Sequence, residues 1–116
     1  QQVRTIDFMP TILNYLEIKQ DQSYENMDGV SLLPLMNGKS MEEKIAFSET
    51  GNPLDDKKPP KEPNTKSIRT SKWKLIINEY NNTRELYDLE NDPDEKNNVV
   101  EKYTDVEQTL RDKFFI

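Results

Sequence analysis

The densest group of residues that could do chemistry is a run of carboxylates in the last third of the chain: Glu85, Asp88, Glu90, Asp92, Asp94 and Glu95. Asp88, Glu90 and Asp92 stand at alternate positions, as calcium ligands do in an EF-hand loop. Pro93, however, stands where that loop requires Gly, and Val99 stands where it requires a bidentate Glu. We therefore interpret the run as a solvated turn whose acids cap neighbouring N–H groups, and we assign no metal ligand.

The residue types that carry most acid–base and metal chemistry in proteins are missing. The 116 residues include no Cys and no His, so the chain offers no thiolate, no disulfide and no imidazole base. Only carboxylates, lysines, hydroxyls and tyrosines remain for catalysis. We assign no catalytic residue and expect no cofactor in this chain.

Charge and hydropathy narrow the range of partners. Sixteen Lys and Arg residues against 22 Asp and Glu residues give a net charge of −6. Contacts to phosphate groups need clustered Lys and Arg, so we expect neither nucleic acid nor an anionic membrane surface as a partner. Lys57, Lys58 and Lys61 form a small basic group, but acidic neighbours weaken its field. No apolar run approaches the roughly 20 residues of a membrane span, and the N-terminus lacks a signal-peptide pattern.

Three isolated features could touch a ligand or carry a modification. Glu49 ends a predicted strand and is placed like a residue at the lip of a pocket. Trp73 lies among basic residues and could stack on a sugar or aryl group, but an aromatic residue on a sheet more often packs in the core, which we favour. Asn81 begins an Asn-Asn-Thr pattern that fits a weak N-glycosylation signal.

The sequence supplies few apolar residues for the core of the elements that must position these residues. Apolar residues, with glycine included and tyrosine left out, make up 36 of the 116 residues, or 31%, against roughly 45–50% in an ordinary globular domain. We expect a folded but marginal unit that leans on a larger body.

The first third of the chain predicts a helix followed by a single helical turn. Apolar residues recur there at three- and four-residue spacing: Ile6, Met9, Ile12, Leu13 and Leu16. This stripe predicts a core-facing helix of about three turns, with Thr5 or Asp7 as cap and Pro10 in or near the first turn. Further on, Ser31 is the expected N-cap of one helical turn that contains Pro34.

The rest of the chain predicts an antiparallel sheet and a final helix. Strands are expected over residues 44–50 and over 67–80 with a break near 70–72, and residues 85–89 form the partner of a hairpin. Residues 52–66 hold four prolines among charged residues and predict a long irregular loop. Asn97 or Asn98 is the expected cap of a helix through Leu110. The fold class is α+β, a small antiparallel sheet with flanking N-terminal and C-terminal helices.

Four stretches in order resemble the C-terminal part of a sulfatase of the alkaline phosphatase superfamily. They are Asp7-Phe8-Met9-Pro10-Thr11-Ile12-Leu13, the segment from Asp28-Gly29-Val30 to Asn37-Gly38, the strand pair around Arg69-Thr70-Ser71-Lys72-Trp73, and the segment from Glu85-Leu86-Tyr87 to Glu95 with Asn98. Each motif alone is weak, but together they cover almost the whole chain. The resemblance implies a piece of a larger α/β sulfatase fold.

The family hydrolyses sulfate esters with a formylglycine, a calcium ion and Lys and His residues around the sulfate. The resemblance implies that calcium and formylglycine belong to the upstream part of the parent protein, because the motifs for them have no counterpart in this sequence. The chain would then be a non-catalytic fragment whose partner is the missing N-terminal catalytic domain, with a sulfate ester as the substrate of the parent.

The resemblance also assigns regions to the parent. Residues 1–40 would be the helix and linker at the end of the large α/β domain, and residues 41–116 a small antiparallel-sheet subdomain with its terminal helix. The loop after the first strand would border the substrate cleft, with Glu49 and Asn52 as its candidate residues.

Two other interpretations remain open. The parent could cleave phosphate or phosphonate esters on the same scaffold, or the chain could be a free-standing interaction module. Many sulfatases are exported, so the resemblance leaves export of the parent open as well.

Overall fold

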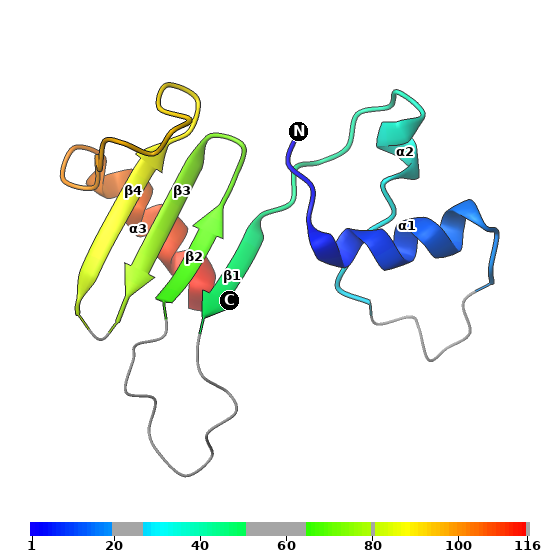
Figure 1. Ribbon diagram of the computed structural model, residues 1–116, viewed down its shortest axis with the longest axis horizontal. Coiled ribbons are helices and arrows are strands. Elements are labelled where there is room, and N and C mark those ends of the chain that lie inside the picture. Colours follow the sequence, from blue (N-terminus) through cyan, green and yellow to red (C-terminus); the bar gives the residue numbers. More distant parts are fainter. Residues whose placement is uncertain (20–26, 51–64, 80, 116) are drawn as a thin grey trace, which may run out of the picture. The chain divides into compact units, whose positions relative to one another are not determined.

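The structure is a computed structural model that describes residues 1–19, 27–50, 65–79 and 81–115. The chain forms two compact units, Gln1–Lys44 and Ile45–Ile116, which we describe separately (Figure 1). The first unit contains a 3-10 turn η1 (Thr5–Asp7) and the helices α1 (Phe8–Tyr15) and α2 (Leu33–Met36). The second contains β1 (Ala46–Thr50), β2 (Thr65–Arg69), β3 (Trp73–Asn78), β4 (Thr83–Asp88), α3 (Thr104–Asp112) and a 3-10 turn η3 (Lys113–Phe115).

The second unit is a four-stranded antiparallel sheet with α3 on one face. The strands follow one another in the order β1-β2-β3-β4, and Ile68, Leu75 and Leu86 lie opposite one another on β2, β3 and β4. These three side chains are fully buried, and Leu110 of α3 completes the core. Because side chains alternate between the two faces of a strand, this register fixes which face α3 covers (Figure 1). The predicted α+β class and the predicted β3–β4 hairpin are confirmed.

The final helix begins later than the sequence predicts. Its N-cap is Tyr103, which makes no side-chain capping hydrogen bond. Asn98 is instead bound to the edge of β4, where its Oδ1 accepts from Leu86 N at 3.0 Å and its Nδ2 donates to Arg84 O at 3.2 Å. Val99 N donates to Leu86 O at 2.8 Å. Asn98, one of the two residues expected to cap a helix, therefore covers part of an exposed strand edge together with Val99.

The first unit is held by polar contacts around Asp7, a residue that is 1% exposed. Its carboxylate accepts from the guanidinium of Arg4 at 2.7 Å and 3.2 Å and from the backbone N–H groups of Arg4 and Val30, both at 3.0 Å. Gly29 lies so close that an added Cβ would be 2.0 Å from Ile6 O. These contacts fasten the 28–30 segment to the start of α1.

Two sequence expectations for the first unit are wrong in detail. α1 exists and has Pro10 in its first turn, but Ile6, Met9, Ile12 and Leu16 are about half exposed, so the stripe does not face a core. The N-cap of α2 is Leu32, not Ser31. The Ser31 hydroxyl accepts from Leu33 N at 3.3 Å and donates to Asn14 Oδ1 at 2.9 Å, so it connects the segment to α1. None of the described helices is long and apolar enough to cross a membrane.

Candidate functional site

The acidic run, which begins in β4 and continues into the turn after it, contains carboxylates that hold backbone N–H groups. Asp88 accepts from Glu90 N at 3.2 Å and from Asn91 Nδ2 at 2.8 Å, and Asp92 accepts from Asn97 N at 2.7 Å. The Asn91 side chain lowers the pKa of Asp88, and the backbone N–H groups of residues 96 and 97 lower the pKa of Asp92. The predicted role of these acids as caps of a solvated turn is confirmed.

Other acids of the run are paired with neighbouring side chains. Glu95 binds Lys74 at 2.6 Å, Glu90 binds Lys72 at 3.1 Å, and Asp94 binds Lys96 at 2.7 Å. Tyr87 donates its hydroxyl to Glu85 at 2.8 Å, and this bond raises the pKa of Tyr87. Among the described residues, no group of three or more acids is placed to hold a metal ion. The donor set of this turn therefore does not fit a calcium site.

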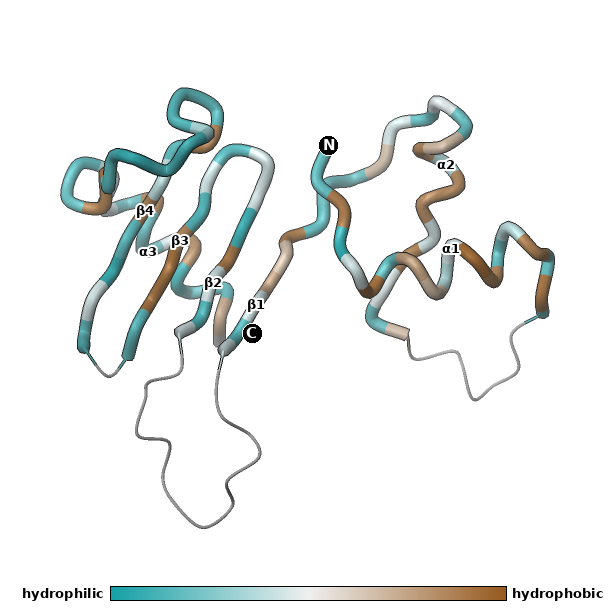
Figure 2. Tube along the Cα trace, viewed as in Figure 1, coloured by the Kyte–Doolittle hydropathy of each residue, from teal (hydrophilic) through white to brown (hydrophobic). Residues whose placement is uncertain are grey.

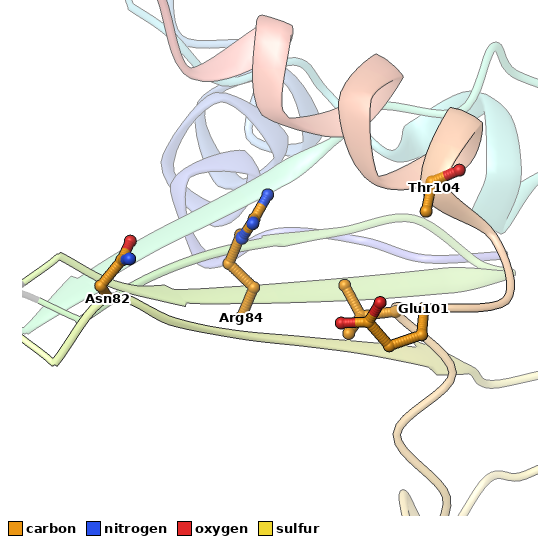
Figure 3. Close-up of a pocket in the computed structure, with 5 residues that line it drawn as sticks. Asn82, Arg84, Glu101 and Thr104 are labelled. Atoms are coloured by element: carbon orange, nitrogen blue, oxygen red, sulfur yellow. The ribbon is translucent and has the colours of Figure 1, made fainter.

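A shallow polar pocket of about 180 Å³ lies in the second unit, where β4 and the segment before α3 meet. Its lining residues are Asn82, Arg84, Val100, Glu101 and Thr104. Figure 3 shows Arg84 extending from β4 toward α3, with Glu101 and Thr104 on the other side of the pocket. The lining supplies hydrogen-bond donors and acceptors for a small polar group. It includes no nucleophile paired with a base, so we assign the pocket no catalysis.

An ion-pair network extends from the pocket to α3. Arg84 binds Glu107 at 3.2 Å, and Glu107 also lies 3.4 Å from Arg111 one helical turn further on. Glu107 is 5% exposed, so the two guanidinium groups neutralise a buried carboxylate. None of these three residues is among the candidates that the sequence suggests. Their only sequence signal is the i, i+4 pair of opposite charges, which many helix surfaces share.

Trp73 belongs to the packing of the second unit. Its ring lies 5.1 Å from the Tyr103 ring, centroid to centroid, and packs against the buried core. The Lys72 ammonium lies 5.6 Å from the Trp73 ring centroid. The interpretation of Trp73 as a packing residue is confirmed.

The other candidate residues lie at strand ends and turns. Glu49 is exposed on β1 and stands opposite Lys66 of β2 in the register. Asn81 is exposed at the turn between β3 and β4. Asn52 and the lysines at positions 57, 58 and 61 lie outside the described residues.

Comparison with known proteins places these observations in a family. The C-terminal region of N-sulphoglucosamine sulphohydrolase, as a family, matches residues 1–115. No functionally curated protein matches the chain.

Solved structures share the fold. A Bacteroides thetaiotaomicron VPI-5482 protein, provisionally designated a sulfatase, is 22% identical with a TM-score of 0.76, covering 93% of this chain and 23% of its own. A protein solved with its substrate D-glucosamine-2-N,6-O-disulfate is 24% identical with a TM-score of 0.70. The match covers 91% of this chain and 22% of that protein. A 2-O GAG sulfatase is 23% identical with a TM-score of 0.73, covering 93% and 23%. The chain thus spans less than a quarter of each.

Proposed function

Because the chain belongs to the family of C-terminal regions of N-sulphoglucosamine sulphohydrolases, we propose that it is the non-catalytic part of an enzyme that hydrolyses sulfate esters. The observation that carries this proposal is the family match over residues 1–115. The four sequence stretches that resemble sulfatases lie in the same order within that range.

The division of labour within the parent follows from the side chains of this chain. It has no Cys and no His, and the carboxylates of its acidic turn are engaged with N–H groups and lysines. We therefore place the nucleophile, which the family makes as formylglycine, and the metal ion, expected to be calcium, in the preceding part of the parent. In this chain no residue is assigned to hold either group.

The test compares the full-length parent with the 116-residue chain. We expect the parent to release sulfate from an aryl sulfate and from N-sulfated or O-sulfated glucosamine, and the chain alone to release none with added calcium. Sulfate release by the purified chain would contradict the non-catalytic assignment. A parent that cleaves an aryl phosphate or phosphonate in preference to every sulfate ester would favour the alternative hydrolase of the same superfamily.

A finer proposal concerns substrate choice. We assign Glu49, with Asn52 beyond the end of β1, to a loop that borders the substrate cleft of the parent. Support comes from the exposure of Glu49 at the end of an edge strand. In the full-length parent, Glu49→Gln should change the ratio of kcat/KM between two sulfated sugars, while Ser48→Ala, on the same strand, should not. An unchanged ratio in Glu49→Gln would remove Glu49 from the cleft.

The assignment of residues 1–40 to the large domain of the parent also stays a proposal. It is compatible with the observed division of the chain, in which Lys44 ends the first unit and Ile45 begins the second.

A further inference from the structure

One side of α1 is a continuous apolar surface. Its side chains, which we call the α1 apolar face, are Phe8, Met9, Ile12, Tyr15 and Leu16, and each is between 53% and 67% exposed. At 3.6 residues per turn these positions fall within about 120° of the helix circumference. No charged side chain interrupts this arc. The hydrophobic residues of α1 are visible along the helix in Figure 2.

The opposite side of α1 is already occupied. Pro10 is buried, the Thr11 hydroxyl accepts from Leu32 N at 2.9 Å, and Asn14 Oδ1 accepts from the Ser31 hydroxyl at 2.9 Å. The hydrogen bonds from Arg4 and Val30 to the carboxylate of Asp7 form what we call the Asp7 clamp. Together with this clamp, the contacts of Thr11 and Asn14 hold the 28–32 segment against one side of the helix. The α1 apolar face therefore cannot turn inward without breaking them, and its direction is fixed by polar contacts.

A face of this kind is costly to leave in water. Five large side chains, each more than half exposed on about two and a half helical turns, form a contiguous apolar patch of the sort that marks a protein interface. Because the face carries no charge, its partner must offer apolar side chains and not a charged or polar surface.

We propose that the α1 apolar face docks on the part of the parent sulfatase that lies outside these 116 residues. The inference rests on the proposed function, because the family describes a C-terminal region and the solved sulfatases are more than four times as long as the segment that this chain matches. The face is thus an internal interface of a larger protein.

Thiol labelling tests the proposal, because these 116 residues have no cysteine of their own and each introduced thiol is read from the peptide that contains it. Ile12→Cys introduces a thiol in the middle of the face, and Lys39→Cys introduces a matched thiol at an exposed polar position of the same unit. Both variants are made in the full-length parent and in the 116-residue chain. The rate of alkylation is read by mass spectrometry from the peptide that contains each position.

In the native parent we expect the Ile12→Cys thiol to react at least on the order of tenfold more slowly than the Lys39→Cys thiol, because access requires local opening. In the isolated chain and in the denatured parent the two thiols should react at similar rates. Equal rates in the native parent would overturn the proposal. Slow reaction in the isolated chain, with gel filtration showing a dimer, would also overturn it, because a second copy would then be the occupant.

The readout needs no turnover, so it separates this proposal from the proposed function. A parent that cleaves phosphate esters but protects the Ile12→Cys thiol would contradict the substrate class and leave the docking face intact. A second variant guards against misfolding of the thiol variant. Ile12→Ser should lower the unfolding temperature of the parent by several degrees and that of the isolated chain by much less, and equal shifts would count against docking.

Discussion

The two units of the chain differ in where their large apolar side chains lie. In the second unit, Ile68, Leu75, Leu86 and Leu110 are between 0% and 5% exposed. In the first unit, the buried residues among those described are Asp7 and Pro10. Among the described residues, ten large hydrophobic residues are exposed; nine of them belong to the first unit, and the tenth is Phe47. One unit is thus organised around apolar burial and the other around a carboxylate.

The contrast shows that a segment can have a defined fold without burying its own large apolar side chains. The second unit removes apolar surface from water by packing α3 on the sheet, which is the dominant favourable term in folding. The first unit obtains its shape from hydrogen bonds to Asp7 and Thr11, whose net contribution is about 1 kcal/mol for a neutral bond and about 1.5–3 kcal/mol for a bond to a charged group. A unit held in this way keeps its apolar side chains available for another surface.

The largest expected effect is loss of a core side chain in the second unit. Leu75→Ala removes a side chain that is 0% exposed on a central strand, and should lower the free energy of unfolding by about 2–5 kcal/mol. Ile12→Ala, the matched change in the first unit, should alter it by less than about 0.5 kcal/mol in this chain. Urea unfolding followed by the fluorescence of Trp73, the only tryptophan, reads out the second unit, and circular dichroism reads out α1. Similar losses from both changes would abolish the contrast.

The next effect is confined to the first unit. Gly29→Ala places a Cβ 2.0 Å from Ile6 O, a distance that only a backbone shift can relieve, and should cost about 1–3 kcal/mol. Hydrogen exchange of peptides from residues 1–19 should accelerate, while exchange in β3 and β4 stays unchanged. Gly38→Ala is not a suitable control because Gly38 has a φ of +74°. Ser40→Ala serves instead, and accelerated exchange in β3 after Gly29→Ala would show that the units are coupled.

Much of the second unit could be predicted from the sequence, because alternation and turn residues are local signals. The strand that contains Trp73 and Leu75 and the turn at Asn81 are examples. The start of α3 could not be predicted in this way. An Asn side chain can cap a helix N-terminus or bind the backbone at a strand edge equally well. Whether Asn98 binds a helix N-terminus or β4 depends on tertiary contacts.

The first unit shows a different limit. The periodicity of Met9, Ile12 and Leu16 correctly predicts a helix with an apolar side, but periodicity does not say what covers that side. The clamp at Asp7 was missed as well, since a carboxylate near a helix start normally stays in solvent. The sequence signal for this clamp would have been Gly29 and Val30, because the clamp requires both residues close to Asp7. For the candidate site, the sequence placed the acids in a turn but gave no sign of the Arg84 pocket.

A smaller effect concerns the edge of the second unit. Asn98→Ala removes the acceptor of Leu86 N and the donor to Arg84 O, and should lower the free energy of unfolding by about 1–2 kcal/mol. Asn97→Ala is a matched control on the neighbouring position, where the lost side-chain bond is to Asp92 in the exposed turn. The Asn98 variant should also speed amide exchange at Leu86. Equal stability of the two variants would show that Asn98 does not secure β4.

The smallest expected effect is a loss of stability of the first unit at low pH. The Arg4 guanidinium, with the Val30 and Arg4 backbone N–H groups, holds the pKa of Asp7 below its ordinary value of 3.8. A carboxylate with a lowered pKa stabilises the folded state fully above its ordinary pKa, and this contribution is lost as the pH falls through the lowered value. Protonation of Asp7 should therefore loosen the first unit by roughly 0.5–1 kcal/mol at low pH.

Amide chemical shifts measure this effect at the atoms concerned. The Val30 amide donates to Asp7 Oδ1, so its shift should titrate with a midpoint below 3.8, and Asp7→Asn should abolish that titration. The Asn97 amide, which donates to Asp92, should titrate below 3.8 in both proteins, because the pKa of Asp92 is also lowered. A Val30 midpoint at or above 3.8 would mean that the clamp does not favour the charged carboxylate. The first unit would then need another source of order, and the direction of the α1 apolar face would no longer be fixed by Asp7.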